Sequence, residues 1–222
     1  MGLAGFGIGL VGLAFLPYVM PAPTAIVLLT IYSTVFALVV FVQLRQDVDV
    51  RGVVGLFVGS VVGTPLGVWV LATLPVTALN RLIGLMLVVV VVLEFLGLFP
   101  DHLRGRGWGL GTGVVAGVLG AAVGTPGPPV VIYMASQGWS PRTIKANLQL
   151  FFVSNQAVTL AGYWWAGLLT MEVLRLGVSF AVPAALGAGV GIALFDRVDP
   201  VRFRRLVFVL LLVSGVVLLA RG

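Results

Sequence analysis

A proline-rich break lies within an apolar stretch of the chain and is the feature most suited to binding chemistry. Residues 125–129 read Thr-Pro-Gly-Pro-Pro, and three prolines with a glycine in five positions cannot continue a helix. Pro129 suits the first turn of a new helix, whose unpaired amides would be those of residues 130–132. Such a helix end binds anions, and Thr125 would add a hydroxyl and Gly127 an amide. The alternative is an ordinary tight turn between two helices.

The helix expected after this break carries amide and hydroxyl side chains. Asn147, Ser154 and Asn155 fall within an arc of about 100°, while Gln149 and Gln156 lie on nearly the opposite side. Amides exposed to lipid are costly, so both groups are expected to face protein or a cavity. The first group could line the path of an anionic substrate, and interhelical hydrogen bonds are the structural alternative.

Acidic side chains are few. Glu94 is the one carboxylate expected within a membrane span, where a buried acid could relay protons. The alternative is that Glu94 lies close enough to a helix end to reach the membrane surface. The other acids lie beside basic residues in expected loops and are interpreted as surface charges; they are Asp47, Asp49, Asp101, Glu172, Asp196 and Asp199.

The composition excludes most classes of soluble protein. Of 222 residues, 60% are hydrophobic and 9% are charged, whereas a soluble domain carries about a quarter charged residues. The chain is therefore expected to be an integral membrane protein. It has no cysteine and a single histidine, His102, which argues against thiol catalysis, a zinc site and a histidine-dependent triad. We predict no catalytic residues, no cofactor and no metal.

The basic residues lie in short gaps between apolar runs. The net charge of +6 therefore indicates membrane topology rather than binding to nucleic acid. The first fifteen residues lack a basic segment and an evident cleavage site, so we expect them to belong to the folded chain rather than to a signal peptide.

Several apolar runs are long enough for a membrane helix, which needs about 20 residues. We predict helices at 23–43, 53–73, 80–99, 142–165, 173–195 and 202–220. Two further stretches, 3–20 and 109–136, could each be one span or a helix-break-helix hairpin that returns to the same face.

The chain also resembles itself. A shift of 124 residues aligns residues of the two halves without a gap: Arg51 with Arg175, Gly63 with Gly187, Gly67 with Gly191, Arg81 with Arg205 and Leu82 with Leu206. A shift of 108 aligns Gly5, Gly9 and Gly12 with Gly113, Gly117 and Gly120. We predict two membrane repeats, 1–98 and 108–222, joined by the loop 99–107. The alternative is chance alignment of glycine-rich apolar sequence.

The positive-inside rule distinguishes the two topologies. Eight full spans would divide the cations almost evenly, six against seven. With a re-entrant hairpin opening each half, only Arg81, Arg175 and Arg221 lie on one face. The other ten then share the opposite face: Arg45, Arg51, Arg104, Arg106, Arg142, Lys145, Arg197, Arg202, Arg204 and Arg205. We therefore predict an all-α inverted repeat, in which each half is a broken-helix hairpin followed by three transmembrane helices.

Glycines spaced by four residues predict close helix packing. Gly59, Gly63 and Gly67, with their counterparts Gly187 and Gly191, form small-residue seams along which helix backbones can approach each other. We expect these glycines to serve packing only.

The second half resembles the TauE/SafE sulfite exporter family of TSUP-type membrane transporters. The resemblance is carried by the glycine-rich run 113–124, the break Thr-Pro-Gly-Pro-Pro, the segment 130–133, Ser140-Pro141 and the polar helix with Asn155. It extends more weakly over the entire chain. The first half departs from the family pattern, because the segment from Gly12 to Pro17 and Tyr18 has no glycine in its turn.

This resemblance implies a transporter of sulfite, sulfonates or related small organic anions. We predict a secondary carrier whose substrate binds near the midplane of the membrane. The carrier is expected in the inner membrane of a prokaryote, with the lipid bilayer as its other partner. The sequence does not determine the oligomeric state, and a homo-oligomer is one alternative. The expected binding residues are Thr125, Gly127, Val130, Tyr133, Asn147, Ser154, Asn155 and Tyr18, with Glu94 for proton coupling. A passive anion channel and a non-transporting membrane scaffold are the alternatives.

Overall fold

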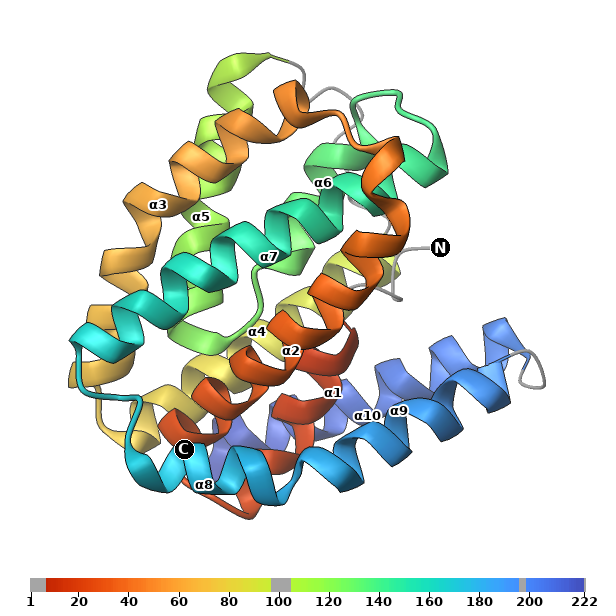
Figure 1. The fold of residues 1–222 in the computed structure, drawn as a ribbon. Coiled ribbons are helices and arrows are strands. Elements are labelled where there is room, and N and C mark those ends of the chain that lie inside the picture. The colour runs from red at the N-terminus through yellow and green to blue at the C-terminus, as the bar shows by residue number, and fades with distance from the viewer. Residues whose placement is uncertain (1–6, 97–104, 196–198, 222) are drawn as a thin grey trace.

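The computed structural model describes residues 7–96, 105–195 and 199–221, and helices are the regular structure among them, with no strand. The helices of the first half are α1 (Gly7–Phe15), α2 (Ala22–Leu44), α3 (Val50–Thr73) and α4 (Val76–Leu96), with short 3-10 turns at η1 (Leu16–Tyr18) and η2 (Arg45–Asp47). The second half has α5 (Arg106–Val123), α6 (Gly127–Ala135), α7 (Pro141–Trp165), α8 (Met171–Ser179), α9 (Ala181–Phe195) and α10 (Pro200–Arg221) (Figure 1).

Five of the six predicted helices are present, with ends that differ by a few residues where the structure describes them, and residues 97–99 of the predicted helix 80–99 lie outside the described part of the chain. The single helix predicted at 173–195 is wrong. This stretch divides at Phe180 into α8 and α9. Pro183 explains the division, because it has no N–H to donate and its ring clashes with the carbonyl one turn earlier. The Tyr32 hydroxyl of α2 holds α8 by donating to the carbonyl of Gly177 at 2.6 Å.

The stretch 109–136 forms a helix-break-helix hairpin. Gly124 ends α5 with a left-handed φ of 70°, and its amide donates to the carbonyl of Gly120 at 3.0 Å. The hairpin returns to the end of the bundle where it began, because the Tyr133 ring of α6 lies against Gly109 at the start of α5. The first-half stretch 3–20 differs, since its described residues form one short helix, α1, and the turn η1.

The closest helix pair of the bundle is α3 and α5, which run in the same direction. A β carbon on Gly59, Gly63 or Gly67 of α3 would overlap backbone atoms of α5. The approach is mutual, because a β carbon on Gly113 or Gly117 would overlap backbone atoms of α3. The predicted seam is thus confirmed in the first half, and it holds the hairpin to the bundle.

The predicted counterpart of this seam at Gly187 is wrong. No atom lies within 4 Å of a β carbon built on Gly187, and most of the described side chains of α9 are exposed. Gly191 has surroundings outside the described part of the chain. Figure 1 shows α9 and the first part of α10 extending away from the other helices.

Two pairs of long helices are each antiparallel: α2 with α7, and α4 with α10. Asp47, just after α2, contacts Arg142 at the start of α7, and Thr30 early in α2 lies beside Tyr163 near the end of α7. Gly84 of α4 packs on the carbonyl of Gly215 in α10. Residues later in α4 contact residues earlier in α10, so α4 and α10 are antiparallel as well.

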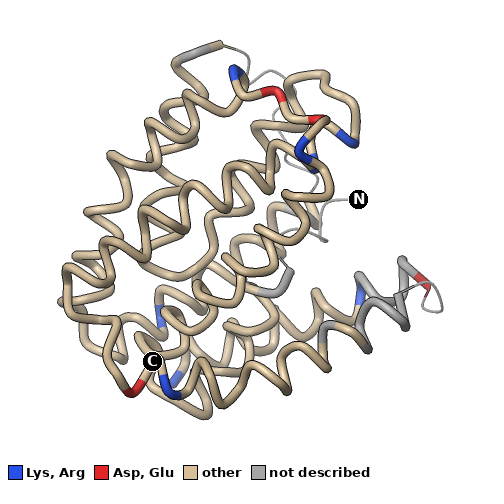
Figure 2. Tube along the Cα trace, in the orientation of Figure 1, with Lys and Arg blue, Asp and Glu red and all other residues tan. Residues whose placement is uncertain are grey.

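Polarity in this bundle is distributed as expected for a protein surrounded by lipid. Many valine, leucine and aromatic side chains are exposed, while several amides and hydroxyls of α3 and α7 are buried. Within the described part of the chain, three helical segments are long and apolar enough to span a membrane: Ala22–Asp47, Val50–Thr73 and Val76–Leu93. Figure 2 shows the described charged residues near helix ends, with long uncharged stretches between them.

Exposed tryptophans mark the two ends of the apolar zone. Trp108 lies at the start of α5, whereas Trp69, Trp164 and Trp165 lie at the far ends of α3 and α7. Tryptophan is enriched where the hydrocarbon core meets the headgroups. The chain is therefore an integral membrane protein by both composition and structure.

Replacing Gly63 with alanine should destabilise the protein by about 1–3 kcal/mol, because the new methyl group would overlap the Val114 carbonyl oxygen and neither backbone can move freely. The matched control is Gly111→Ala on α5, where a β carbon meets nothing within 4 Å. Thermal unfolding in detergent should show a loss for Gly63→Ala and no loss for Gly111→Ala. Equal melting temperatures for the two variants would contradict a close α3–α5 seam.

Candidate anion-binding site

The break between α5 and α6 lies at the centre of the bundle, where several helices converge. Thr125 is 2% exposed, and its hydroxyl donates to the Met86 sulfur of α4 at 3.0 Å. A β carbon on Gly9 of α1 would lie 3.2 Å from the carbonyl oxygen of Gly124. The start of α1, the middle of α4 and the break thus meet around one buried point.

Prolines remove most of the free donors from the start of α6. The helix begins at Gly127, so Pro129 lies in its first turn, as predicted. A helix leaves about four amides at its start without partners, and here those positions are 126–129. Three of these four are prolines, so the N–H of Gly127 is the one free donor among them. The break therefore offers one backbone donor to an anion instead of several.

Val130 falls within the first full turn of α6 and serves a different purpose from the predicted one. Its side chain is fully buried, and it packs in an apolar cluster with Met134, Phe151 and Phe152. Its amide lies at the position where hydrogen bonding inside the helix begins. Val130 therefore anchors α6 to α7.

Asn155 of α7 directs an unpaired amide toward the break. Its side chain is 1% exposed, and neither Oδ1 nor Nδ2 has a hydrogen-bond partner. A β carbon on Gly120 would lie 3.1 Å from Nδ2 and 3.1 Å from Cβ of Pro126, so Asn155 and the break approach the same side of α5. Leaving a buried polar group unpaired costs about 1–3 kcal/mol. Such a group in a native protein calls for a partner that binds there, such as a water molecule or a ligand.

A polar stripe continues from Asn155 along α7. Thr159 and Tyr163 follow at intervals of four residues, and both are buried. The Tyr163 hydroxyl donates to the carbonyl of Ala121 at 2.7 Å, which satisfies an acceptor near the end of α5. Tyr163 was not predicted to belong near the break, although its spacing of eight from Asn155, with Thr159 midway between them, is a signal that could have found it.

Three predicted site residues lie away from the break. The Tyr133 side chain reaches the N-terminal end of α5 beside Gly109, about 9 Å further along α6 than Gly127. Tyr18 is 46% exposed, and its hydroxyl donates to the carbonyl of Ser214 at 3.3 Å. Ser154 donates to the carbonyl of Leu150 within its own helix at 2.8 Å. Of the predicted set, the structure thus brings together Thr125, Gly127 and Asn155.

Asn147 has a partner at one end of the bundle. Its Oδ1 accepts the N–H of Asp49 at 2.8 Å, where Asp49 forms the N-terminal cap of α3. Its Nδ2 is buried without a hydrogen-bond partner. Asn147 therefore ties α7 to the start of α3. Glu94 lies in α4, but its side chain is outside the described part of the chain.

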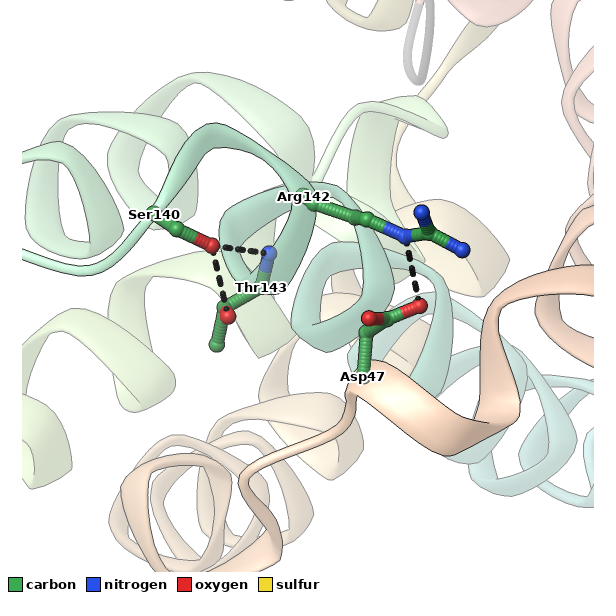
Figure 3. A network of polar contacts seen from close by, with 4 residues as sticks. All are labelled: Asp47, Ser140, Arg142 and Thr143. Carbon is green, nitrogen blue, oxygen red and sulfur yellow. Dashed lines mark hydrogen bonds and ion pairs between the residues drawn. The ribbon is translucent and has the colours of Figure 1, made fainter.

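An ion pair reinforces the same end of the bundle. The Arg142 Nε donates to Oδ2 of Asp47 at 2.8 Å, and the Ser140 hydroxyl caps α7 by accepting the N–H of Thr143 at 3.1 Å (Figure 3). Because the Arg142 side chain is 72% exposed, the pair contributes at most about 1 kcal/mol. It joins the α2–α3 connection to α7 and does not reach the break.

Replacing Asn147 with alanine should destabilise the protein by about 1–3 kcal/mol, because the Asp49 amide would lose its acceptor in a partly buried position. Thermal unfolding in detergent measures this loss. The control is Lys145→Ala, an exposed position on the same helix, which should leave the melting temperature unchanged. If Asn147→Ala unfolded at the wild-type temperature, the tie between α7 and α3 would be unimportant for stability.

Comparison with known proteins identifies a family for this chain. The family model described as "Sulfite exporter TauE/SafE" matches residues 1–218. Neither the curated proteins nor the solved structures contain a significant match. Among the described residues, no three His, Asp or Glu side chains gather as a metal site.

Proposed function

Because the chain belongs to the TauE/SafE sulfite exporter family, we propose that it is a secondary carrier for a small sulfur-containing anion, sulfite or a sulfonate. The anion binds at the α5–α6 break, between Asn155, Gly127 and Thr125. The observation that carries this assignment is the unpaired, fully buried amide of Asn155 beside the break.

The donors around the break suit an anion that must be released again. Asn155 Nδ2 and the Gly127 N–H are neutral donors. The start of α6 adds the positive end of the helix dipole. A site of neutral donors holds an anion without the strong attraction of a buried cation, so binding and release remain balanced.

Thr125 supplies a third donor that can change partner. Its hydroxyl now points to the Met86 sulfur, and a thioether is a weak acceptor. Rotation of the hydroxyl toward a sulfonyl or sulfite oxygen would exchange this weak hydrogen bond for a charge-assisted one. Thr125 therefore becomes a ligand when the anion arrives.

The arrangement of the long helices supports an inverted repeat that alternates access to this site. The pairs α2–α7 and α4–α10 match corresponding parts of the two predicted repeats, and both pairs are antiparallel. Inverted repeats are common in secondary transporters, where one half moves against the other around a central site. In this proposal the halves expose the break to each face in turn, and Glu94 is the candidate for proton coupling.

Uptake of labelled sulfite and of a panel of sulfonates into proteoliposomes tests the proposal. With an inward or outward pH gradient, a coupled carrier should give saturable flux of one anion and accelerated counterflow. Flux that neither saturates nor shows counterflow would indicate a passive anion channel. No flux of any anion from correctly inserted protein would contradict transport.

Asn155→Ala should reduce this flux at least tenfold, since the anion loses a donor, while the melting temperature stays the same or rises because an unpaired buried amide is removed. Asn155→Asp should abolish flux, because a carboxylate would repel the anion. The matched control is Ser154→Ala, whose hydroxyl is bonded within its own helix, and its flux should equal that of wild type. Wild-type flux in Asn155→Ala would remove Asn155 from the site.

A further inference from the structure

Two grooves on the outside of the helix bundle each combine an apolar floor with one arginine. The first, of about 640 Å³, lies between the end of α1 and α10 and includes Arg205 and Phe15. The second, of about 400 Å³, lies between the start of α4 and the end of α10 and includes Arg81 and Leu219. Both volumes fall in the range of small-molecule sites, about 300–1,000 Å³.

The two grooves use corresponding positions of the two predicted repeats. The 124-residue shift that aligns Arg81 with Arg205 also aligns Leu82 with Leu206 and Leu85 with Val209. All six of these residues line a groove, three in each. The combination of an arginine with an apolar strip is thus present twice, in the same register of α4 and α10.

The arginines lie at opposite ends of the helix pair. Each is in the second turn of its helix, and α4 and α10 are antiparallel. In a membrane-spanning bundle, one guanidinium is then near each headgroup layer, where a long basic side chain can place its charge. Both side chains are exposed, and neither forms an ion pair with a carboxylate in the part of the chain that the structure describes.

We propose that each groove binds one anionic phospholipid, with the phosphate on the arginine and an acyl chain along the apolar floor. A guanidinium matches a phosphate through paired hydrogen bonds, and basic pockets between membrane helices bind anionic headgroups. The exposed side chains of Leu206, Val209 and Leu85 supply the surface that an acyl chain covers. An apolar face of a second copy would cover the same surface but leave the guanidinium without a counter-charge.

Native mass spectrometry and thermal unfolding of the full chain in detergent test this proposal with two defined lipids. Phosphatidylglycerol should bind with up to two molecules per chain and raise the melting temperature, and phosphatidylcholine should do neither. This comparison uses the wild-type protein and needs no variant to fold. Equal binding of the two lipids, or none of either, would overturn the proposal.

Variants then assign the sites. Arg81→Gln and Arg205→Gln should each remove one bound phosphatidylglycerol, and the double variant should remove both. The matched control is Arg175→Gln, an exposed arginine outside both grooves, which should keep both lipids. Two bound lipids in the double variant would overturn the assignment.

Substitutions that fill the apolar floor of a groove, without changing its charge, distinguish a bound lipid from other occupants. Leu85→Trp and Val209→Trp should each expel one phosphatidylglycerol while leaving the chain's helical content unchanged. If these variants instead convert a lipid-free dimer into a monomer, a second copy occupies the grooves and the proposal fails. Lipid binding is measured without transport, so its outcome is separate from that of the proposed function.

Discussion

Backbone amides and carbonyls that are surrounded by hydrocarbon have no water to bond with, and this constraint shapes every part of the bundle. Continuous helices satisfy the constraint through their own hydrogen bonds. The break at 124–126 is the place in the centre of the bundle where a helix ends and another starts. Gly124 returns its amide to the Gly120 carbonyl, Tyr163 donates to the Ala121 carbonyl, and prolines remove donors that would otherwise be unpaired. A break is therefore tolerated at this depth, with the Gly127 amide as the remaining backbone donor at the start of α6.

Close backbone packing keeps this break in position. The glycines of α3 and α5 allow the two helices to approach until their backbones touch, which gives the first limb of the hairpin a rigid support. The second limb is held by apolar side chains such as Val130 and Phe151 against α7. The hairpin is thus held with its break beside Asn155. The proposed anion site depends on this placement, because a few hydrogen-bond donors must be in the right geometry to replace the water around an anion.

Burial alone does not identify the binding residues. Asn147 and Asn155 are eight positions apart on α7, so two helical turns separate them, and both are almost fully buried. Yet Asn147 bonds the Asp49 amide at the end of the bundle, while Asn155 faces the break without a partner. Helical periodicity places Asn147 and Asn155 on one face of α7. It does not determine which neighbouring residues each of them contacts along the length of the helix.

The sequence by itself determined the class of the protein, most of the helices, the glycine seam on α3 and the break at Thr125-Pro-Gly-Pro-Pro, because composition, periodicity and proline chemistry act locally. Only the tertiary structure decided which polar residues gather at the break, since that depends on how distant helices cross. It separated Tyr18 and Tyr133 from Asn155 and added Tyr163. It also divided 173–195 at Phe180 and began α6 at Gly127, where the position of a helix end changes the number of free amides. Local rules thus predicted the elements, and the long-range contacts selected the site.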